Sequence, residues 1–158
     1  MKKLKLYLDT SVLSFAIATD VPAERQITLK LFEEVNQGKH EVFISDVVIK
    51  EINRAPEPIL TSLKALISEL NAVVLLSNED AQSLAKKYVE HDIIPNKHGD
   101  DALHIAVASV NDLDVIVSWN FSHIVKVKTK KEVTGINLLM GYKEIEIYSP
   151  KEVIENAD

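Results

Sequence analysis

The chain has 158 residues, of which 46% are hydrophobic, a formal net charge of −6 and no cysteine. These values fit one globular domain over residues 1–158, and they exclude a disulfide framework, a thiolate metal site and nucleic-acid binding through bulk positive charge. No apolar segment reaches the roughly 20 residues of a membrane helix, and the apolar run before Asp9 is too short for a signal peptide, so we expect a cytoplasmic protein without a membrane partner.

Short apolar runs alternate with helical patterns along the chain. In chain order, the expected elements are a strand at 4–8, a helix at 24–37, a strand at 41–44, a helix that carries Glu51, a helix at 59–70, a strand at 72–76, a helix capped by Asn78, a helix that begins at Asp100 and Asp101, a strand at 114–117, a helix from Thr129 to about Gly141, a strand at 144–148 and a last helix capped by Ser149. This alternation predicts an α/β domain with a mainly parallel central sheet.

Local signals mark several of these boundaries. Gly38 stands where the residue after a helix is expected. Two capping boxes, Thr129 with Glu132 and Ser149 with Glu152, predict the starts of the last two helices.

Four polar side chains stand where an expected strand or helix begins or ends. They are Asp9, Glu51, Asp101 and Asn120. In an open parallel sheet, ligands bind beyond the carboxyl ends of the strands, so segments far apart in the sequence meet at one edge. Carboxylates gathered there form a hard-oxygen site for Mg²⁺ or Mn²⁺, which is the usual apparatus for hydrolysing a phosphodiester. The pattern therefore indicates a metal-dependent nuclease.

Three of these residues also have a simpler structural interpretation. Asp9 would cap a helix at 11–18. Glu51 would face solvent on its helix and pair with Arg54. Asn120 would be an ordinary turn residue after a strand.

The adjacent acids Asp100 and Asp101 call for two explanations. One of them is a helix cap or first-turn acid that favours the helix dipole. If Asp101 faces inward with Ile105 and Ala108, it points toward the sheet edge, where a carboxylate without a cation is costly. His104 is interpreted as a packed, hydrogen-bonded helix residue rather than a catalytic one.

The residues around and after Asn120 form two further groups. Trp119 is interpreted as a packing residue rather than a base-stacking one, and Phe121 and Ile124 as core. A run of positive charge follows, which predicts a phosphate-contacting patch for RNA, with an ordinary solvated surface as the alternative. Its members are Lys126, Lys128, Lys130 and Lys131.

Four motifs in order resemble the PIN domain family, and the VapC-type toxin ribonucleases in particular. They are Leu8-Asp-Thr-Ser-Val-Leu13, Ser45-x-x-Val-x-x-Glu51-Ile, Asp101-Ala-Leu-His-Ile-Ala-x-Ala and Val117-Ser-Trp-Asn-Phe-x-His-Ile124. The likeness covers nearly the whole chain, from about Leu4 to Ile147. It implies a three-layer α/β/α fold and hydrolysis of RNA that depends on Mg²⁺ or Mn²⁺.

The resemblance also implies roles for individual residues. The family's acidic positions fall on Asp9, Glu51 and Asp101. Its fourth position is often Asp and is Asn120 here, which offers a carbonyl oxygen without a charge. Members of this type are commonly homodimers silenced by an antitoxin protein, so the resemblance implies both kinds of partner.

The resulting hypothesis is a metal-dependent endoribonuclease, possibly the toxin of a toxin–antitoxin pair. Asp9, Glu51, Asp101 and Asn120 are its expected catalytic residues. The first three hold Mg²⁺ or Mn²⁺, and the possible supporting residues are Ser11 and Asp100. The alternative is a non-catalytic PIN-like domain that binds RNA or protein. A phosphatase of the haloacid dehalogenase type is disfavoured, because Ser11 stands where its second aspartate is needed.

Overall fold

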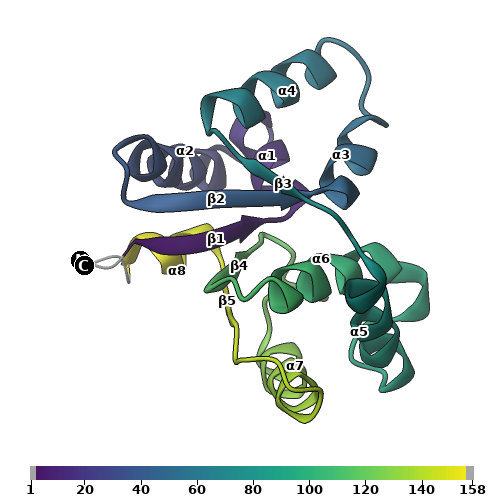
Figure 1. The fold of residues 1–158 in the computed structure, drawn as a ribbon. Coiled ribbons are helices and arrows are strands. Elements are labelled where there is room, and N and C mark those ends of the chain that lie inside the picture. Colours follow the sequence, from purple (N-terminus) through teal and green to yellow (C-terminus); the bar gives the residue numbers. More distant parts are fainter. Residues whose placement is uncertain (1–2, 156–158) are drawn as a thin grey trace.

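Five parallel strands form the centre of a computed structural model that describes residues 3–155 (Figure 1). Their order across the sheet is β3-β2-β1-β4-β5. The strands are β1 (Leu4–Leu8), β2 (His40–Ser45), β3 (Val73–Leu75), β4 (Val115–Val117) and β5 (Glu146–Tyr148). The parallel sheet predicted from the sequence is therefore confirmed, and each expected strand lies within two residues of its expected bounds.

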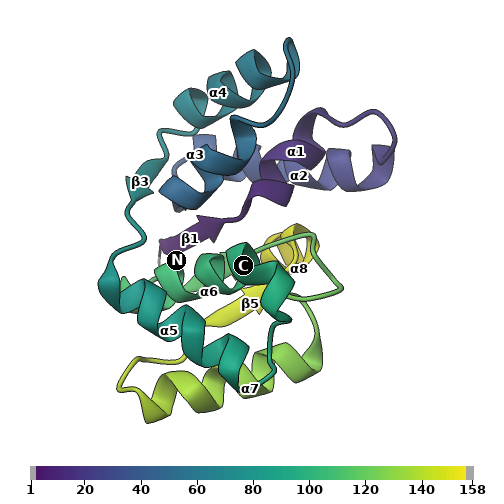
Figure 2. The same ribbon diagram turned by 90° about the vertical axis from the view of Figure 1, so that its right-hand side faces the viewer.

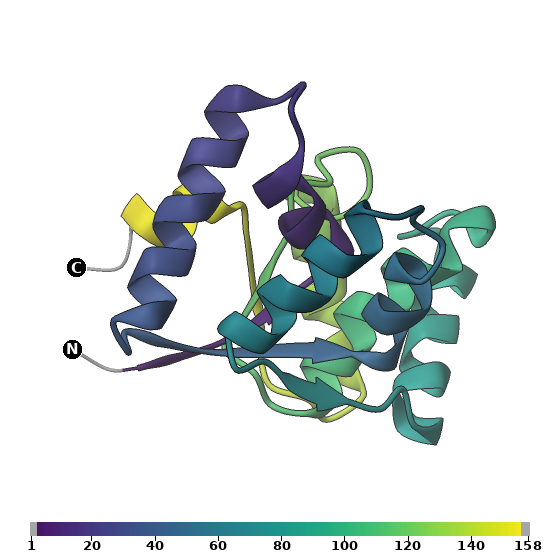
Figure 3. The ribbon, with the colours of Figure 1, turned by 90° about the horizontal axis from the view of Figure 1, so that it is seen from above.

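Within residues 3–155, eight α-helices and one 3₁₀ turn lie between the strands or follow the last one. They are α1 (Thr10–Ile17), α2 (Pro22–Asn36), α3 (Asp46–Ile52), α4 (Ile59–Glu69), α5 (Glu79–Glu90), η1 (Asn96–His98), α6 (Gly99–Val110), α7 (Val127–Leu139) and α8 (Pro150–Glu155). Figure 1 places α1, α2, α3 and α4 above the sheet and α5, α6 and α7 below it, which confirms the three-layer α/β/α fold. Seen from above, α1, α2 and α4 lie over the strands (Figure 3).

The core lies on both sides of the central strands. Leu6, Tyr7 and Leu8 of β1 are fully buried, as are Ile116 and Val117 of the neighbouring β4. Parallel strands that are covered on both faces form such continuous apolar runs, because each side chain meets a helix layer. The small residues of α6 allow that helix to lie close under the sheet, beside α5 (Figure 2).

The sheet reverses its strand order at β1, which pairs with β2 on one side and β4 on the other. Leu8 pairs with Val117 in this register. Asp9 and Ser118, the next residue on each strand, consequently lie side by side at the carboxyl edge. A reversal of this kind opens a crevice between the connections that leave in opposite directions, and it is where open α/β sheets bind ligands.

Most of the predicted helix signals are confirmed. Asn78 and Ser149 cap α5 and α8 through their side chains, and Glu152 completes the capping box by accepting from the Ser149 amide. Gly38 and Gly141 follow α2 and α7 with φ of 81° and 86°, a left-handed conformation that favours glycine.

Two structural predictions were wrong, and a third was partly right. Helix α7 begins at Val127, so Thr129 is not a cap but a buried residue of the first turn, whose Oγ1 donates to the carbonyl of His123 at 3.0 Å. Phe121 is 55% exposed rather than core, because its loop leaves the sheet edge, although Ile124 is buried as predicted. Helix α6 begins at Gly99 without a side-chain cap, so Asp100 and Asp101 are not caps but first-turn acids, which is the other interpretation given for them.

Candidate active site

Asp9 follows β1 directly and is 4% exposed. Its Oδ1 accepts hydrogen bonds from Ser11 Oγ at 2.5 Å and from the Val12 amide at 3.3 Å, and its Oδ2 accepts from Ser118 Oγ at 2.5 Å. Asp9 is thus the N-cap of α1, as the simpler interpretation predicted. Burial raises the pKa of its carboxyl, and the charge of His104 and these hydrogen bonds offset only part of that rise.

The two serine hydroxyls fix the segment that follows β4 against α1. Ser11 Oγ accepts from the Trp119 amide and Ser118 Oγ accepts from the Asn120 amide, each at 2.9 Å. Each hydroxyl therefore donates to the Asp9 carboxylate and accepts from the chain after β4. This arrangement holds Asp9 rigidly and sets where Asn120 lies.

Glu51, on α3, points into the protein instead of into solvent. Its Oε1 accepts from Thr10 Oγ1 at 2.8 Å and from His104 Nε2 at 2.6 Å. The predicted pairing with Arg54 was wrong, because helix α3 presents Glu51 to α1 and α6. Burial would raise the pKa of Glu51, but the hydrogen bond and charge of His104 outweigh burial and lower it.

His104, on α6, connects Glu51 to the centre of the sheet. The ring is buried, as the sequence predicted, and its Nδ1 lies 2.6 Å from the Tyr7 hydroxyl. That hydroxyl lies 2.7 Å from Ser45 Oγ at the end of β2. Burial alone would lower the pKa of His104, but its hydrogen bond to Glu51 and the surrounding carboxylate charges outweigh burial and raise it. A protonated His104 would partly neutralise the acids around it.

Asp101 lies in the first turn of α6 and meets Asn120 across the edge of the sheet. Asn120 Nδ2 donates to Asp101 Oδ2 at 3.2 Å. Burial raises the pKa of Asp101, and the positive charges of three nearby histidines, His104, His123 and His98, counteract it.

Asn120 does not turn its carbonyl oxygen toward the acids, which corrects the expectation of a neutral oxygen ligand. Its Oδ1 accepts from the amides of Ser122 and His123 at 3.1 and 3.0 Å. The turn after β4 leaves these two amides in need of an acceptor, and Asn120 supplies it. Asn120 is therefore both a turn residue and a hydrogen-bond donor to Asp101.

The three carboxylates form what we call the acidic site, consisting of Asp9, Glu51 and Asp101. They are joined through shared neighbours, since Ser118 and Asn120 connect Asp9 to Asp101. Their oxygens do not all lie within 4.8 Å of one another. Carboxylates raise one another's pKa where they lie close together, so their separation limits this mutual repulsion.

The donor set of the acidic site fits a hard divalent cation. Glu51 Oε2 and Asp101 Oδ1 accept no hydrogen bond from any described residue, which leaves one oxygen of each available. Carboxylate oxygens of this kind are the ligands that Mg²⁺ and Mn²⁺ prefer. Asp9, Glu51 and Asp101 are accordingly the residues that could hold such an ion.

The other predicted site residues lie outside this group. Asp100 accepts from Lys50 Nζ at 3.0 Å, which connects α6 to α3 on the surface. Lys128 and Lys130 lie 3.8 and 3.5 Å from the carboxylates of Glu132 and Glu152. Two members of the run, Lys126 and Lys131, are exposed and form no ion pair with any described residue.

Several contributing residues were not singled out in the sequence. Thr10 is one of them, and its hydroxyl donates to Glu51. Ser118 had a detectable signal, because it follows β4 directly and the alignment of two parallel strands brings it beside Asp9. Tyr7 and Ser45 gave no signal, since their hydrogen bonds join residues 38 or more positions apart.

Trp119 packs inside the protein, as predicted. Its indole stacks on Phe15 with ring centroids 5.6 Å apart, and its Nε1 donates to Thr28 Oγ1 at 2.9 Å. The indole thereby fixes the chain between β4 and Asn120 against α1 and α2.

The sequence profile of the PIN domain matches residues 6–121, which include Asp9, Glu51, Asp101 and Asn120. The chain belongs to the PIN domain family. Its fold is also that of solved PIN structures. VapBC2 from Rickettsia felis, bound to a DNA fragment from its promoter, matches with a TM-score of 0.63 and 14% identity over 92% of this chain and 98% of that one.

Two further structures share the fold. VapC20 of Mycobacterium tuberculosis, described as a sarcin–ricin loop cleaving toxin, has a TM-score of 0.57 and 17% identity over 89% of this chain and 98% of that one. DNA-bound VapBC of Salmonella typhimurium has a TM-score of 0.55 and 21% identity over 93% and 98%. The comparison with curated proteins yields no significant match. Within residues 3–155, no helix is both long and apolar enough to cross a membrane.

Proposed function

We propose that this PIN domain is an endoribonuclease that uses Mg²⁺ or Mn²⁺ and acts as the toxin of a toxin–antitoxin pair. The observation that carries the proposal is the acidic site: three carboxylates from β1, α3 and α6, two of them buried enough to raise their pKa, meet at the strand-order reversal of a PIN fold. Carboxylates with a raised pKa that lie at the ligand-binding edge of a sheet are candidates for a functional site.

The residues of the acidic site and their neighbours have different proposed roles. Asp9, Glu51 and Asp101 would hold the ion, which when bound supplies charge neutralisation at the phosphate and a more acidic water. Ser11 and Ser118 fix the position of Asp9. The remaining contacts to Glu51 and Asp101 set the direction of those carboxylates, and electrostatic catalysis depends on such fixed positions.

Substrate binding would fall to exposed cations. Lys126 and Lys131 have no carboxylate partner in the described part of the chain, so their charges are available to phosphates. Asn120 would keep Asp101 oriented through its amide.

The partners are also part of the proposal. Two of the similar structures are VapBC assemblies bound to DNA, and a third is a toxin that cleaves the sarcin–ricin loop. By analogy we propose an RNA substrate, an antitoxin protein and a homodimer for this chain, and we propose that residues 1–158 form a single domain.

A second candidate is a PIN domain that binds RNA or a protein without cleaving it. The orientation of Asn120 favours this candidate, because the carbonyl oxygen that could replace a fourth carboxylate ligand is bound to two backbone amides. The site then has three charged ligands instead of four, which weakens its hold on a hard cation.

Cleavage of labelled RNA by purified, EDTA-treated protein separates the two candidates. We expect cleavage of single-stranded or structured RNA only when Mn²⁺ or Mg²⁺ is added, and at least a hundredfold loss in Glu51→Gln, since removing a charge-stabilising group typically costs about that factor. Glu33→Gln, on an exposed acid of α2, is the matched control. RNA binding without cleavage under any of these conditions would establish the second candidate and overturn the first.

A further inference from the structure

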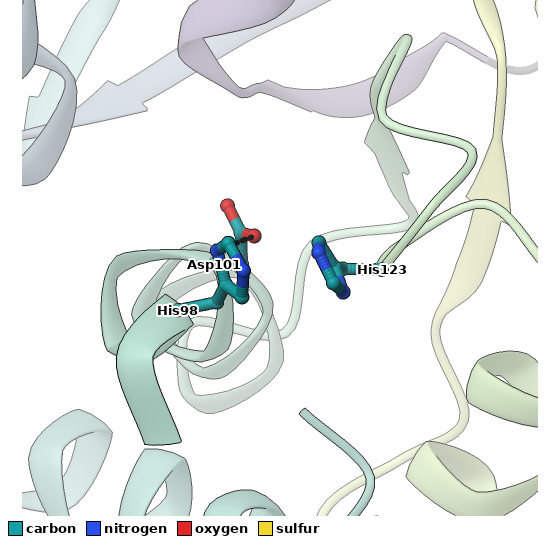
Figure 4. A group of neighbouring side chains, drawn as sticks. All are labelled: His98, Asp101 and His123. Carbon is teal, nitrogen blue, oxygen red and sulfur yellow. Dashed lines mark ion pairs between the residues drawn. The ribbon is translucent and has the colours of Figure 1, made fainter. Parts of the chain in front are cut away.

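A second group of potential ligands lies beside the acidic site. His98 at the end of η1, Asp101 in the first turn of α6 and His123 in the loop after β4 point toward one another (Figure 4). Each offers one ligand atom, and the three atoms lie within 4.8 Å of one another. Among the described residues, this is the one group of three such side chains that meets that distance.

One long ion pair and one ring contact join the members of this group. His98 Nδ1 lies 3.8 Å from Asp101 Oδ2, which is beyond hydrogen-bond distance. Neither imidazole forms a side-chain hydrogen bond within residues 3–155. The two rings approach with centroids 4.0 Å apart and planes inclined by 31°, and such closeness is unfavourable if both rings carry a proton.

We propose that His98, Asp101 and His123 form a binding site for a divalent transition-metal ion such as Zn²⁺, next to the acidic site and sharing Asp101 with it. Two imidazoles and one carboxylate suit borderline ions such as Zn²⁺, Ni²⁺ or Fe²⁺, whereas Mg²⁺ prefers oxygen ligands alone. Three protein ligands leave at least one coordination position open.

The geometry allows the site to close on an ion with small movements. Two nitrogens at the Zn–N distance of about 2.0–2.1 Å lie about 3.4 Å apart in a tetrahedral site, so the ligand atoms must approach by about 1 Å or a little more. The side chains of His98 and Asp101 are 34% and 19% exposed. Side chains at that level of exposure can change rotamer without disturbing the core, and the ion can reach them from solvent.

Sharing Asp101 couples the two sites. Its Oδ2 faces His98 and the Asn120 amide, and its Oδ1 is the oxygen left for the acidic site. An ion held by both histidines would also tie the loop after β4 to α6. Binding at this second site can be measured without cleavage, so the inference does not depend on the proposed ribonuclease activity.

Calorimetric titration of Zn²⁺ into the untagged, EDTA-treated full chain tests the site. We expect one ion per chain, with affinity at least tenfold weaker in His98→Gln and in His123→Gln. His91→Gln, on an exposed histidine at the end of α5, is the matched control and should bind as the wild type does. Glu51→Gln removes a ligand of the acidic site alone and should also retain Zn²⁺. Equal affinity in all variants, or loss in Glu51→Gln with both histidine variants unaffected, would overturn the proposal.

An NMR measurement on the wild-type chain keeps the test independent of how the variants fold. Zn²⁺ should shift the imidazole nitrogen signals of His98 and His123 and leave those of His40 and His91 in place. Shifts confined to His40 or His91, or no imidazole shift at saturating Zn²⁺, would contradict the assignment.

Discussion

Asp9 and Asp101 carry the largest electrostatic cost in the site. Burial raises the pKa of both carboxyls. Two serine hydroxyls and a backbone amide donate hydrogen bonds to Asp9 and offset the cost of burying its charge. Asp101 has a single donor among the described residues, the Asn120 amide. A charged group with so few hydrogen-bond donors is a candidate for binding a ligand.

Asp101→Asn should make the metal-free protein as stable as, or more stable than, the wild type. Because the pKa of Asp101 is raised in the folded state, ionisation favours the unfolded state, so stability is lost as the pH rises through the folded pKa. Asparagine avoids this loss, so the variant should be more stable than the wild type at neutral pH. The difference in stability should vanish below the pKa of Asp101 in the unfolded state. Denaturation of EDTA-treated protein at several pH values measures it, and a variant that is less stable at neutral pH would make Asp101 a structural residue of α6.

Some site residues could be predicted from the sequence, but their contacts could not. Asp9, Glu51 and Asp101 stood out because a strand or helix boundary precedes each of them, and the fold places such boundaries at one edge. The partner of Glu51 could not be found in the same way, since His104 is 53 residues away and the contact depends on how α3 and α6 pack. The orientation of Asn120 was not predictable either, because it is set by hydrogen bonds from two backbone amides of the following turn.

The three helices below the sheet share a buried polar group. Tyr88 on α5 donates to Asn137 Oδ1 on α7, and Asn137 Nδ2 donates to Ser109 Oγ on α6 at 2.9 Å. All three side chains are buried. Because each buried polar atom depends on the next helix for its partner, the group fixes how these helices pack.

Tyr88→Phe should lower the free energy of unfolding by about 1–3 kcal/mol, since it leaves the buried Asn137 oxygen without its donor. Urea denaturation measures the change. Tyr142→Phe is the matched control, because the Tyr142 hydroxyl forms no hydrogen bond with the rest of the described chain. A loss in Tyr88→Phe no larger than in the control would show that water replaces the tyrosine hydroxyl without cost.

The lysine run contains two kinds of side chain. Lys128 and Lys130 pair with carboxylates, whereas Lys126 and Lys131 pair with none in the described residues. Neutralising Lys126 and Lys131 together should weaken RNA binding and flatten its dependence on salt by about 0.7 per lost phosphate contact on a log–log plot. The double variant of Lys128 and Lys130 is the control and should change the slope less, because Glu132 and Glu152 already offset those charges. Equal slopes in the wild type and both variants would assign the whole run to solvated surface.

The elements themselves were largely predictable. Alternation of apolar runs located every strand, and glycine and side-chain caps located most helix ends. The start of α7 was missed because Thr129 and Glu132 match a capping box by spacing, while the threonine hydroxyl is engaged by the carbonyl of His123. A local pattern cannot reveal a partner that depends on the path of the preceding loop.

At the scale of the molecule, strand order is what creates the site. The parallel sheet with β1 at its centre brings segments more than 100 residues apart into contact, as Ser118 and Asp9 show. The alternation of strands and helices predicted the parallel sheet and the edge at which the acids lie, because parallel strands must be joined by crossovers. The three layers were implied by the resemblance to the PIN family. The spacing of the carboxylates was not predictable, because it depends on hydrogen bonds between segments far apart in the sequence.

Mn²⁺ should stabilise the whole protein, because the acidic site exists only in the folded state. At an ion concentration 100 times the dissociation constant, we expect the free energy of unfolding to rise by about 2.7 kcal/mol. Thermal unfolding with increasing Mn²⁺ measures it, and Glu51→Gln should reduce the gain. A melting temperature that stays constant over the titration would contradict a metal site of any useful affinity.

The most direct test of the acidic site is the position of Mn²⁺ in crystals of the protein, located by its anomalous scattering. The account predicts an anomalous peak within coordination distance of Asp9, Glu51 and Asp101, at the carboxyl edge between β1 and β4. Its ligands should include Glu51 Oε2 and Asp101 Oδ1, the oxygens without hydrogen-bond donors in the described structure. No peak at saturating Mn²⁺, or a peak that touches none of these three carboxylates, would contradict the claim that they form a divalent-cation site.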